Sequence, residues 1–378
     1  MTAICQLEGD PAASIGTPGT VAVVPGRVSV VIPVYNREAT VAAAVESCLA
    51  QTFGDVEIII VDDGSTDRTL EVLDGFGHRI KLIAQANGGV GAARNAGTRM
   101  ASGEYVAWMD SDDLAIPGRL SLQAGLLASR PDINLVSSDF SAFTTGKPDY
   151  ESSHIGTYYR AVRRLGGVVN IYPHEDVIAK TDKLGETPVT VRWGQIYESL
   201  LRGNFVHPPT VMVRRSVFDQ AGFFDEALRY STEYDLIIRI ARIGPFAYID
   251  APLLRYRVST TQLSHAAAGG KMPLETVKVL EKVQRDDPEL YARHKPIFQL
   301  RCAESLISAA EGIGSSDPLM ALGLLARGVR FRLLFHNALR AFAHIVAPGF
   351  AITAIRQVKR YRIDQRAAAA RSSPTQWH

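Results

Sequence analysis

The chain reads Trp108-Met109-Asp110-Ser111-Asp112-Asp113 at the end of an apolar run that begins at Tyr105. Such a run, with Gly103 shortly before it, predicts a buried strand. The three carboxylates that follow would then lie at the carboxyl edge of a sheet, where open α/β sheets bind their ligands. Closely spaced carboxylates suit a divalent cation such as Mg²⁺ or Mn²⁺. An acidic turn that caps the helix after Pro117 is the alternative interpretation.

Three further apolar runs precede this one, and each is followed by polar residues. The runs are 28–33, 56–61 and 80–84, and segments with helical spacing separate them. This alternation predicts an α/β fold with a mostly parallel sheet flanked by helices. The polar residues that follow the runs are Tyr35, the pair Asp62-Asp63, Asn87 and the acids at 110–113. Because parallel strands end at one edge, the four clusters are expected to converge.

The rest of the chain separates into regions of different composition. Residues 1–26 and 366–378 are predicted to be a disordered lead-in and tail. Residues 27–265 are expected to form the sheet domain, and 266–365 a helical C-terminal region. Residues 141–183 lack a period, which predicts a long loop or an acceptor-side insertion. Further elements are expected as helices at 120–127 and 233–243 and as strands at 134–138, 210–213, 247–249 and 253–258.

Composition and charge set limits on the function. The 378 residues are 46% hydrophobic and 21% charged, as in globular proteins. The formal net charge of +2 gives no reason to expect nucleic acid as a partner. Cys5, Cys48 and Cys302 lie too far apart for a metal-binding motif. Because we find neither a signal peptide nor an apolar run long enough to cross a membrane, a cytoplasmic enzyme is expected.

The C-terminal region contains a basic segment. Residues 322–346 mix apolar residues with arginines, and a basic cluster follows at 356–362. An amphipathic helix on the inner face of an anionic membrane is one interpretation. A helix that packs on the catalytic domain and exposes a basic face to water is the other.

Four motifs together resemble the family 2 glycosyltransferases. They are Ser29 to Glu38, Val61 to Asp67, Asn87 to Gly97 and Asp110 to Asp113, in the family's order and with its approximate spacing. The resemblance covers roughly residues 27–264 and implies a GT-A fold, in which a Rossmann-like nucleotide-binding half and an acceptor-binding half share one sheet. It implies inverting transfer of a sugar from a nucleotide diphosphate sugar, with a UDP sugar as the expected donor. The implied setting is the synthesis of a polysaccharide or lipid-linked glycan from the cytosolic side.

The resemblance also assigns the residues that bind the donor. Tyr35 would stack on the base, Glu38 would close the pocket, and Asp63 would accept a hydrogen bond from the ring N–H of the base. Arg94 would reach the diphosphate, with a surface ion pair as the alternative. For Asp62 and Asp63 the alternative is a capped turn. The predicted donor-binding set is Pro33, Tyr35, Glu38, Asn87, Asp63, Arg94 and Asp110.

The acids at 110–113 match the family's DXD motif. Asp112 would ligate a Mg²⁺ or Mn²⁺ ion, and Asp110 would bind the ribose or a water on the cation. Asp113 is expected to cap the next helix. The cation would neutralise the diphosphate as it leaves. The predicted metal residues are therefore Asp110 and Asp112.

The general base is expected just before the helix at 233–243. The family's Glu-Asp pair reads Thr232-Glu233 here, so Glu233 stands where the family has its catalytic aspartate. Its side chain is one methylene longer, and a misplacement of about 1 Å can matter greatly to a base. Asp235 is the second candidate. Where the family often has a metal-site histidine this chain has Ser259, with His265 displaced, so we assign no histidine to the metal.

Two other functions stay open at this point. A nucleotidyltransferase shares a similar fold and also uses acids and Mg²⁺, but a glycine- and basic-rich loop would follow its first strand. The sequence at 33–36 is Pro-Val-Tyr-Asn and lacks such a loop. A binding or scaffold protein that keeps the fold without turnover is the second alternative, and the Thr232-Glu233 departure is the feature that favours it.

Overall fold

The computed structural model describes residues 5–6, 21–146, 152–182, 185–259, 270–314, 316–331, 341–342 and 345. The chain divides into two compact units, Met1–Gln262 and Leu263–His378. The predicted boundary at 265/266 and the predicted disordered tail at 366–378 lie outside the described residues. So does most of the predicted lead-in at 1–26.

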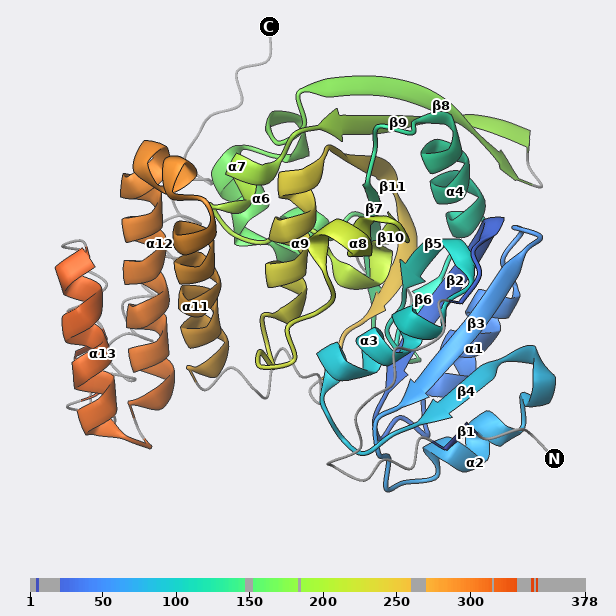
Figure 1. Cartoon of the computed structure of the whole chain (residues 1–378), viewed down its shortest axis with the longest axis horizontal. Helices are drawn as coiled ribbons and strands as arrows, with labels where there is room; N and C mark the ends of the chain where they lie inside the picture. Colours follow the sequence, from blue (N-terminus) through green and yellow to red (C-terminus); the bar gives the residue numbers. More distant parts are fainter. Residues whose placement is uncertain are drawn as a thin grey trace, which may run out of the picture. The chain divides into compact units, whose positions relative to one another are not determined.

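The described residues of the first unit form one mixed sheet of eleven strands (Figure 1). The strands are β1 (Cys5–Gln6), β2 (Val24–Val34), β3 (Val56–Asp62), β4 (Lys81–Ala84), β5 (Gly103–Trp108), β6 (Leu114–Ala115), β7 (Leu135–Phe143), β8 (His174–Asp182), β9 (Gly185–Gly194), β10 (Met212–Arg214) and β11 (Phe246–Arg257). Their order is β1-β4-β3-β2-β5-β10-β7-β11-β9-β8, and β6 pairs with β11.

The half of the sheet from β1 to β5 is parallel, as predicted. β2 lies between β3 and β5, and it pairs in parallel with both. Its residues from Val28 to Val34 are all buried, because helices cover both faces of a parallel sheet. β10 then inserts antiparallel between β5 and β7. The α/β fold with a mostly parallel core is therefore confirmed, and the antiparallel strands extend it on the side away from β2.

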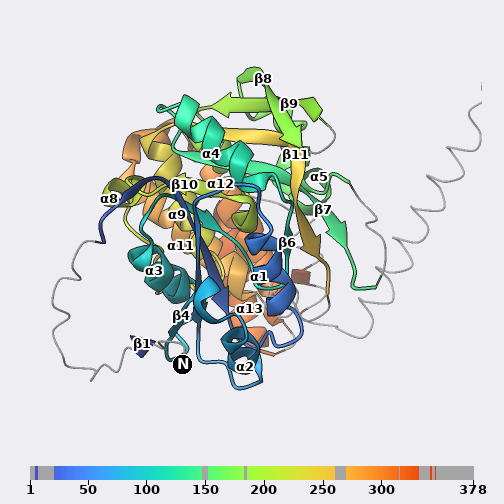
Figure 2. The same ribbon diagram turned by 90° about the vertical axis from the view of Figure 1, so that its right-hand side faces the viewer.

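Helices flank the sheet of the first unit. They are α1 (Val41–Leu49), α2 (Thr69–Asp74), α3 (Val90–Met100), α4 (Arg119–Ser129), α5 (Ile155–Tyr158), α6 (Arg160–Leu165), α7 (Tyr197–Leu200), α8 (Val217–Ala221) and α9 (Thr232–Ile243). Figure 2 shows α1 and α3 on opposite sides of the sheet. α3 lies very close to β2, because a Cβ on Gly97 would come within 2.5 Å of Val31 Cγ1. This close approach fixes α3 against the face of the sheet formed by β2 and β3.

The structure corrects three of the predicted elements. β2 begins at Val24, inside the stretch predicted to be disordered. The prediction of a long loop at 141–183 is wrong, because β7 continues to Phe143 and α5, α6 and β8 follow it. The two closing strands predicted at 247–249 and 253–258 are one strand, β11, with register shifts around Pro252. Pairing with neighbouring strands, which composition does not reveal, stabilises these segments as strands.

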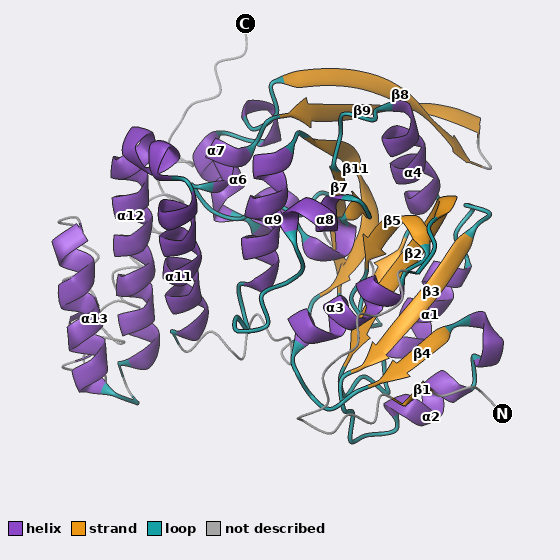
Figure 3. Cartoon of the chain, in the orientation of Figure 1, coloured by secondary structure: helices purple, strands orange, loops and turns teal. Residues whose placement is uncertain are grey.

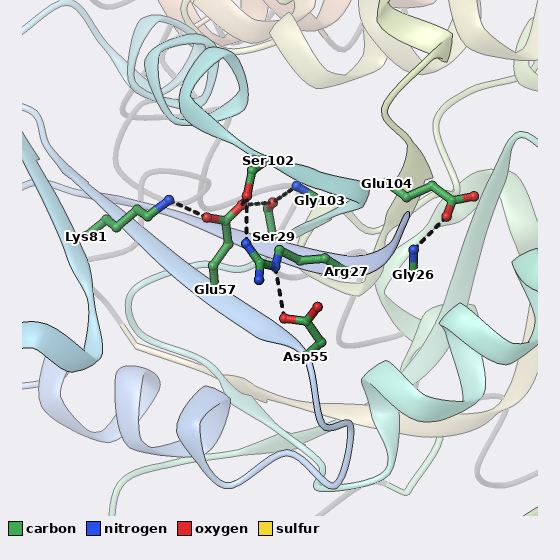
Figure 4. Close-up of polar contacts among 9 residues, drawn as sticks. All are labelled: Gly26, Arg27, Ser29, Asp55, Glu57, Lys81, Ser102, Gly103 and Glu104. Carbon is green, nitrogen blue, oxygen red and sulfur yellow. Dashed lines mark hydrogen bonds and ion pairs between the residues drawn. The ribbon is translucent and has the colours of Figure 1, made fainter. Parts of the chain in front are cut away.

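A polar cluster ties the strands together at the amino end of the sheet (Figure 4). Glu57 on β3 accepts hydrogen bonds from Lys81 Nζ at 2.5 Å, from Ser102 N at 2.6 Å and from the Ser29 hydroxyl. Burial raises the pKa of Glu57, but these donors outweigh it and lower the pKa from 4.5 to about 2. Glu57 therefore joins β2, β3, β4 and the start of β5 as a carboxylate.

We expect Glu57→Gln to lower the free energy of unfolding at pH 7 by about 2 kcal/mol, which allows for solvent screening of its exposed part. The folded protein holds Glu57 ionised to a lower pH than the unfolded chain does. This stabilisation is thus complete above pH 4.5 and is lost as the pH falls toward about 2. Urea unfolding between pH 7 and pH 3 measures it. The exposed Glu46→Gln is the control, and equal pH slopes for wild type and Glu57→Gln would contradict the assignment.

The described part of the second unit is helical (Figure 3). It contains α11 (Lys271–Asp286), α12 (Pro288–Ile313) and α13 (Pro318–Phe331). Leu280, Leu306 and Leu325 are among the residues they bury together. The Asp287 side chain caps α12 by accepting a hydrogen bond from Leu290 N at 3.0 Å. α12 has a kink at His294, two residues before Pro296, where the backbone dihedral angles are not helical.

The predicted membrane-binding segment is only partly described. Arg327 and Arg330 lie on α13, whereas the basic cluster at 356–362 lies outside the described residues. Within the described parts of the chain, we find no helix with the length and apolarity that a membrane span requires. Contact of this region with a membrane surface stays a prediction.

Candidate active site

The loops that follow β2, β3 and β4 contact one another at the carboxyl edge of the sheet. Asn36 joins the first two loops, because its Oδ1 accepts a hydrogen bond from Thr66 N at 2.8 Å. Asp63 joins the second to the third, because Gly88 N and Gly89 N each donate to its carboxylate at 2.8 Å. The predicted convergence is confirmed for these loops. It arises from hydrogen bonds between motifs that are far apart in the sequence.

The predicted base-binding residues occupy the end of β2 and the loop after it. Pro33 is buried in β2 beside Val61 of β3. Tyr35, the first residue after β2, is 45% exposed. An exposed tyrosine ring at this edge is free to stack on a flat base. Glu38 has a different contact, because its Oε2 accepts a hydrogen bond from Arg68 N at 2.9 Å, just before α2. Asn87 is exposed.

The pair Asp62-Asp63 is buried, and both carboxylates accept hydrogen bonds from backbone N–H groups of the loops beside them. Asp63 also accepts a hydrogen bond from Gln85 Nε2 at 2.8 Å, so three protein donors already use its carboxylate. Asp62 Oδ2 accepts from Ser65 N at 3.1 Å. Its Oδ1 is buried and has no hydrogen-bond partner among the described residues. Both acids therefore have the turn-forming role that was the alternative, and the contact of Asp63 with a base stays a prediction.

Arg94 connects α3 to two of the predicted catalytic and metal-binding acids. Its side chain is 2% exposed. Nη2 donates to Asp110 Oδ1 at 2.7 Å, and Nη1 donates to Glu233 Oε1. Burial lowers the pKa of Arg94, but the charges of Glu233 and Asp110 outweigh this and raise it. Arg94 is therefore a fixed buried cation, rather than the member of a surface ion pair that the sequence left open.

The remaining acids of the motif are held by two arginines that the sequence reasoning did not single out. Arg37, in the loop after β2, lies 3.7 Å from Asp112 Oδ2. Arg257 on β11 donates its backbone N–H to Asp113 Oδ1 at 2.8 Å. Asp113 thus fastens the acidic loop to β11. The prediction that it caps the next helix is wrong, because α4 begins after Gly118 without a side-chain cap.

The acidic loop fits a divalent cation. Burial, followed by the negative charges beside them, raises the pKa of both Asp112 and Asp113. Asp113 Oδ2 is buried and has no hydrogen-bond partner among the described residues. A nearby cation would stabilise the ionised forms of these carboxylates and would offset the repulsion between them. Among the described residues no group of three or more His, Cys, Asp or Glu could hold an ion alone, so two carboxylates and the ligand's own oxygens would have to share it.

Glu233 and Asp235 lie in the first turn of α9 but in different surroundings. The Glu233 side chain is 18% exposed, and Arg94 holds one of its oxygens. Asp235 is 2% exposed and accepts hydrogen bonds from Arg239 at 2.7 and 3.0 Å. Arg239 in turn donates to the Phe223 carbonyl at 2.7 Å. Asp235 thus fixes the segment before α9, and its prediction as a substitute base has no support in this geometry.

A second group near the site was also missed by sequence reasoning. His207 is fully buried and stacks on Phe140 with ring centroids 4.0 Å apart. Its Nδ1 lies 3.0 Å from the Tyr159 hydroxyl. Burial, with smaller effects of His154, Arg119 and Arg94, lowers the pKa of His207 to about 3. It is neutral at physiological pH, and the only signal in the sequence was its place just before strand β10.

Comparison with known proteins agrees with this arrangement. Residues 29–181 match the model of glycosyl transferase family 2. An uncharacterized glycosyltransferase of Rickettsia typhi is 28% identical over 241 residues, which are 64% of this chain and 66% of that protein. The chain spans between about a third and two-thirds of the length of the curated relatives it matches.

Two solved structures share the fold. S. aureus TarS residues 1–349, in complex with UDP-GlcNAc, superpose with a TM-score of 0.52 at 15% identity, and the match covers 84% of this chain and 91% of that one. The mannosyltransferase PcManGT of Pyrobaculum calidifontis, in complex with GDP-Man and Mn²⁺, gives a TM-score of 0.50 at 18% identity and covers 85% and 88%. These identities are low enough that they show the fold alone, which is that of GT-A glycosyltransferases. The family model and the curated relative agree with this fold, because residues 29–181 are similar to glycosyl transferase family 2.

Proposed function

We propose that this chain transfers a sugar from a UDP sugar to a hydroxyl group of a glycan or lipid-linked acceptor, with inversion at the anomeric carbon. The observation that carries the proposal is the contact of one buried side chain, Arg94, with both Asp110 and Glu233. Arg94 thus brings Asp110, which is proposed to bind the donor, close to Glu233, which is proposed as the base. A sugar-nucleotide site needs these two functions on either side of the reacting carbon.

The donor would lie across the loops at the carboxyl edge of the sheet. Tyr35 would stack on the base, with Pro33 beneath it. Asp63 would order the loop that carries Asn87 and would meet the edge of the base. Exposure of Tyr35 supports the stacking, and the hydrogen bonds from Gly88 N and Gly89 N to Asp63 support the ordering of the loop. Glu38 acts more remotely, because its contact with Arg68 orders the start of α2 at the rim of this pocket.

Asp110 and Asp112 would hold the divalent cation, which when bound supplies positive charge against the diphosphate leaving group. Arg37, 3.7 Å from Asp112, keeps that carboxylate facing the loop after β2. Asp113 keeps the whole acidic loop against β11 through the Arg257 N–H. These contacts belong to the protein alone, so they position the acids before any ligand binds.

Glu233 would take the proton from the acceptor hydroxyl as its oxygen attacks the anomeric carbon. A new glycosidic C–O bond then forms as the bond from that carbon to the diphosphate breaks, and the electron pair leaves with the diphosphate. Attack from the face opposite the leaving group inverts the anomeric configuration. Glu233 lies in the first turn of α9, where the helix dipole favours a negative charge.

The setting of the reaction is part of the proposal. The similarity of residues 29–181 to glycosyl transferase family 2 supports synthesis of a polysaccharide or lipid-linked glycan on the cytoplasmic side, at or near the inner face of the membrane. The helices of the second unit would provide the peripheral contact there. One observation favours a different function, a sugar-nucleotide-binding protein without turnover, because Glu233 already forms an ion pair with Arg94.

Release of nucleoside diphosphate distinguishes the two. Purified chain is incubated with Mn²⁺ and a panel of UDP and GDP sugars that includes UDP-GlcNAc and GDP-mannose. We expect release from one UDP sugar to exceed release from every GDP sugar at least about 10-fold, since pocket contacts discriminate by this order. Preference for a GDP sugar would contradict the UDP assignment. Binding of a sugar nucleotide with no release from any donor or acceptor would favour the non-catalytic function.

A further inference from the structure

We propose that Arg94 is a positioning residue for the catalytic base, and that it does not bind the diphosphate of the donor. The inference rests on the proposed function, in which Glu233 is the base. It replaces the role that the sequence suggested for Arg94. Three observations carry it, namely the contacts of one face of α3, the burial of the guanidinium and the hydrogen bonding of Glu233.

One face of α3 holds the segment that leads to the base. Gly91, Arg94 and Asn95 lie on this face, at helical spacings of three and four. Asn95 exchanges hydrogen bonds of 2.9 Å with the backbone N–H and C=O of Phe224. A Cβ on Gly91 would come within 2.9 Å of Thr232 Oγ1, so the helix and the start of α9 touch there. The residues on either side of Arg94 thus fasten the segment 224–232 that precedes Glu233.

Arg94 is enclosed by aromatic and acidic side chains. Its Cζ lies 5.7 Å from the centroid of the Phe224 ring, and that ring packs on Trp108 at 4.9 Å. The side chain is 2% exposed, and two of its nitrogens already donate to acids. The third, Nε, has no hydrogen-bond partner among the described residues but is itself buried, so a phosphate would have to displace Asp110 or Glu233 to reach the guanidinium. Unpairing buried charges is strongly unfavourable.

The hydrogen bonding of Glu233 explains how a longer side chain can serve as the base. Arg94 Nη1 holds Oε1, and Oε2 has no hydrogen-bond partner among the described residues. One oxygen is thus anchored and the other is available for the acceptor's proton. Glutamate has one more rotatable bond than aspartate, and the anchor removes that freedom. Arg94 therefore compensates for the presence of Glu at this position.

The test compares Arg94→Gln and Arg94→Lys with Arg99→Gln, an exposed arginine on the same helix. Turnover is measured as nucleoside diphosphate release from the best donor of the panel, and affinity by calorimetry with UDP and Mn²⁺. We expect the kcat of Arg94→Gln to fall about 100-fold, because a misplacement of about 1 Å can have that effect on a base. Arg94→Lys keeps the charge but cannot donate to both acids in fixed geometry, so we expect a fall of about 10-fold. The Kd for UDP should stay within about threefold in all three.

A Kd for UDP that rises 10-fold or more in Arg94→Gln, with kcat nearly unchanged, would overturn the inference and return Arg94 to the diphosphate. Because loss of a buried charge can unfold a domain, Glu233→Asp provides a second test that leaves Arg94 in place. The shorter carboxylate cannot stay on Arg94 and reach the acceptor, so we expect kcat to fall about 10-fold. A rise in kcat would overturn the inference. Wild-type chain that binds UDP but turns over no donor would instead contradict the proposed function.

Discussion

Glu233→Gln is expected to lower kcat about 1,000-fold and to leave the Kd for UDP within about threefold. Glutamine has the shape of glutamate and can still accept a hydrogen bond from Arg94, but it cannot take a proton at neutral pH. Loss of a general base reduces rates by about 10²- to 10⁴-fold. UDP does not require the base, so its binding should be insensitive to the change. Nucleoside diphosphate release gives kcat, and calorimetry gives the Kd.

Asp219→Asn on α8 is the matched control for this substitution. It removes a carboxylate of the same unit that is exposed to water, and its activity should equal that of wild type. Normal turnover in Glu233→Gln would show that another group accepts the proton. Loss of UDP binding together with turnover would instead show that Glu233 acts through the fold of the site.

Asp112→Asn is expected to weaken UDP binding in the presence of Mn²⁺ by about 100-fold. A neutral amide is a much poorer ligand for a hard cation than a carboxylate. The ion pair of Asp112 with Arg37 is long, at 3.7 Å, so replacing the carboxylate is expected to cost little stability. In wild type, UDP should bind more tightly in Mn²⁺ than in EDTA. The variant should lose most of this difference in UDP affinity.

Calorimetry with UDP, in Mn²⁺ and then in EDTA, measures both effects, and Asp219→Asn again serves as the control. Thermal melting of the two variants shows whether each has kept its fold. Unchanged UDP affinity of Asp112→Asn in Mn²⁺ would place the cation elsewhere or exclude it from donor binding.

The sequence predicted the sheet and its binding edge best where a strand is followed directly by polar residues. Runs such as 58–61 are apolar throughout because the sheet buries both their faces, and a parallel sheet then requires Asp63 and Asp110 to share an edge. The order and spacing of the four motifs indicated the resemblance to a glycosyltransferase family. The core of the fold and the position of most site residues therefore follow from local pattern and one topological rule.

What the sequence missed depends on contacts between distant segments. Residues 141–183 have no period, yet β8 within them forms because β9 pairs with it and β9 pairs with β11. Arg94 lies in a motif that suggests a phosphate contact, but its partner Glu233 is 139 residues away. Asp113 was expected to act locally and instead holds β11. Such pairings are decided by packing of the whole unit, which a single sequence does not display.

Titration of the wild-type chain with UDP, with Mn²⁺ and then with EDTA, tests most directly whether the loops at the carboxyl edge form one sugar-nucleotide site. We expect saturable binding of one UDP per chain in Mn²⁺ and binding at least about 10-fold weaker in EDTA, because the cation links Asp110 and Asp112 to the diphosphate. Absence of UDP binding under both conditions would contradict the account.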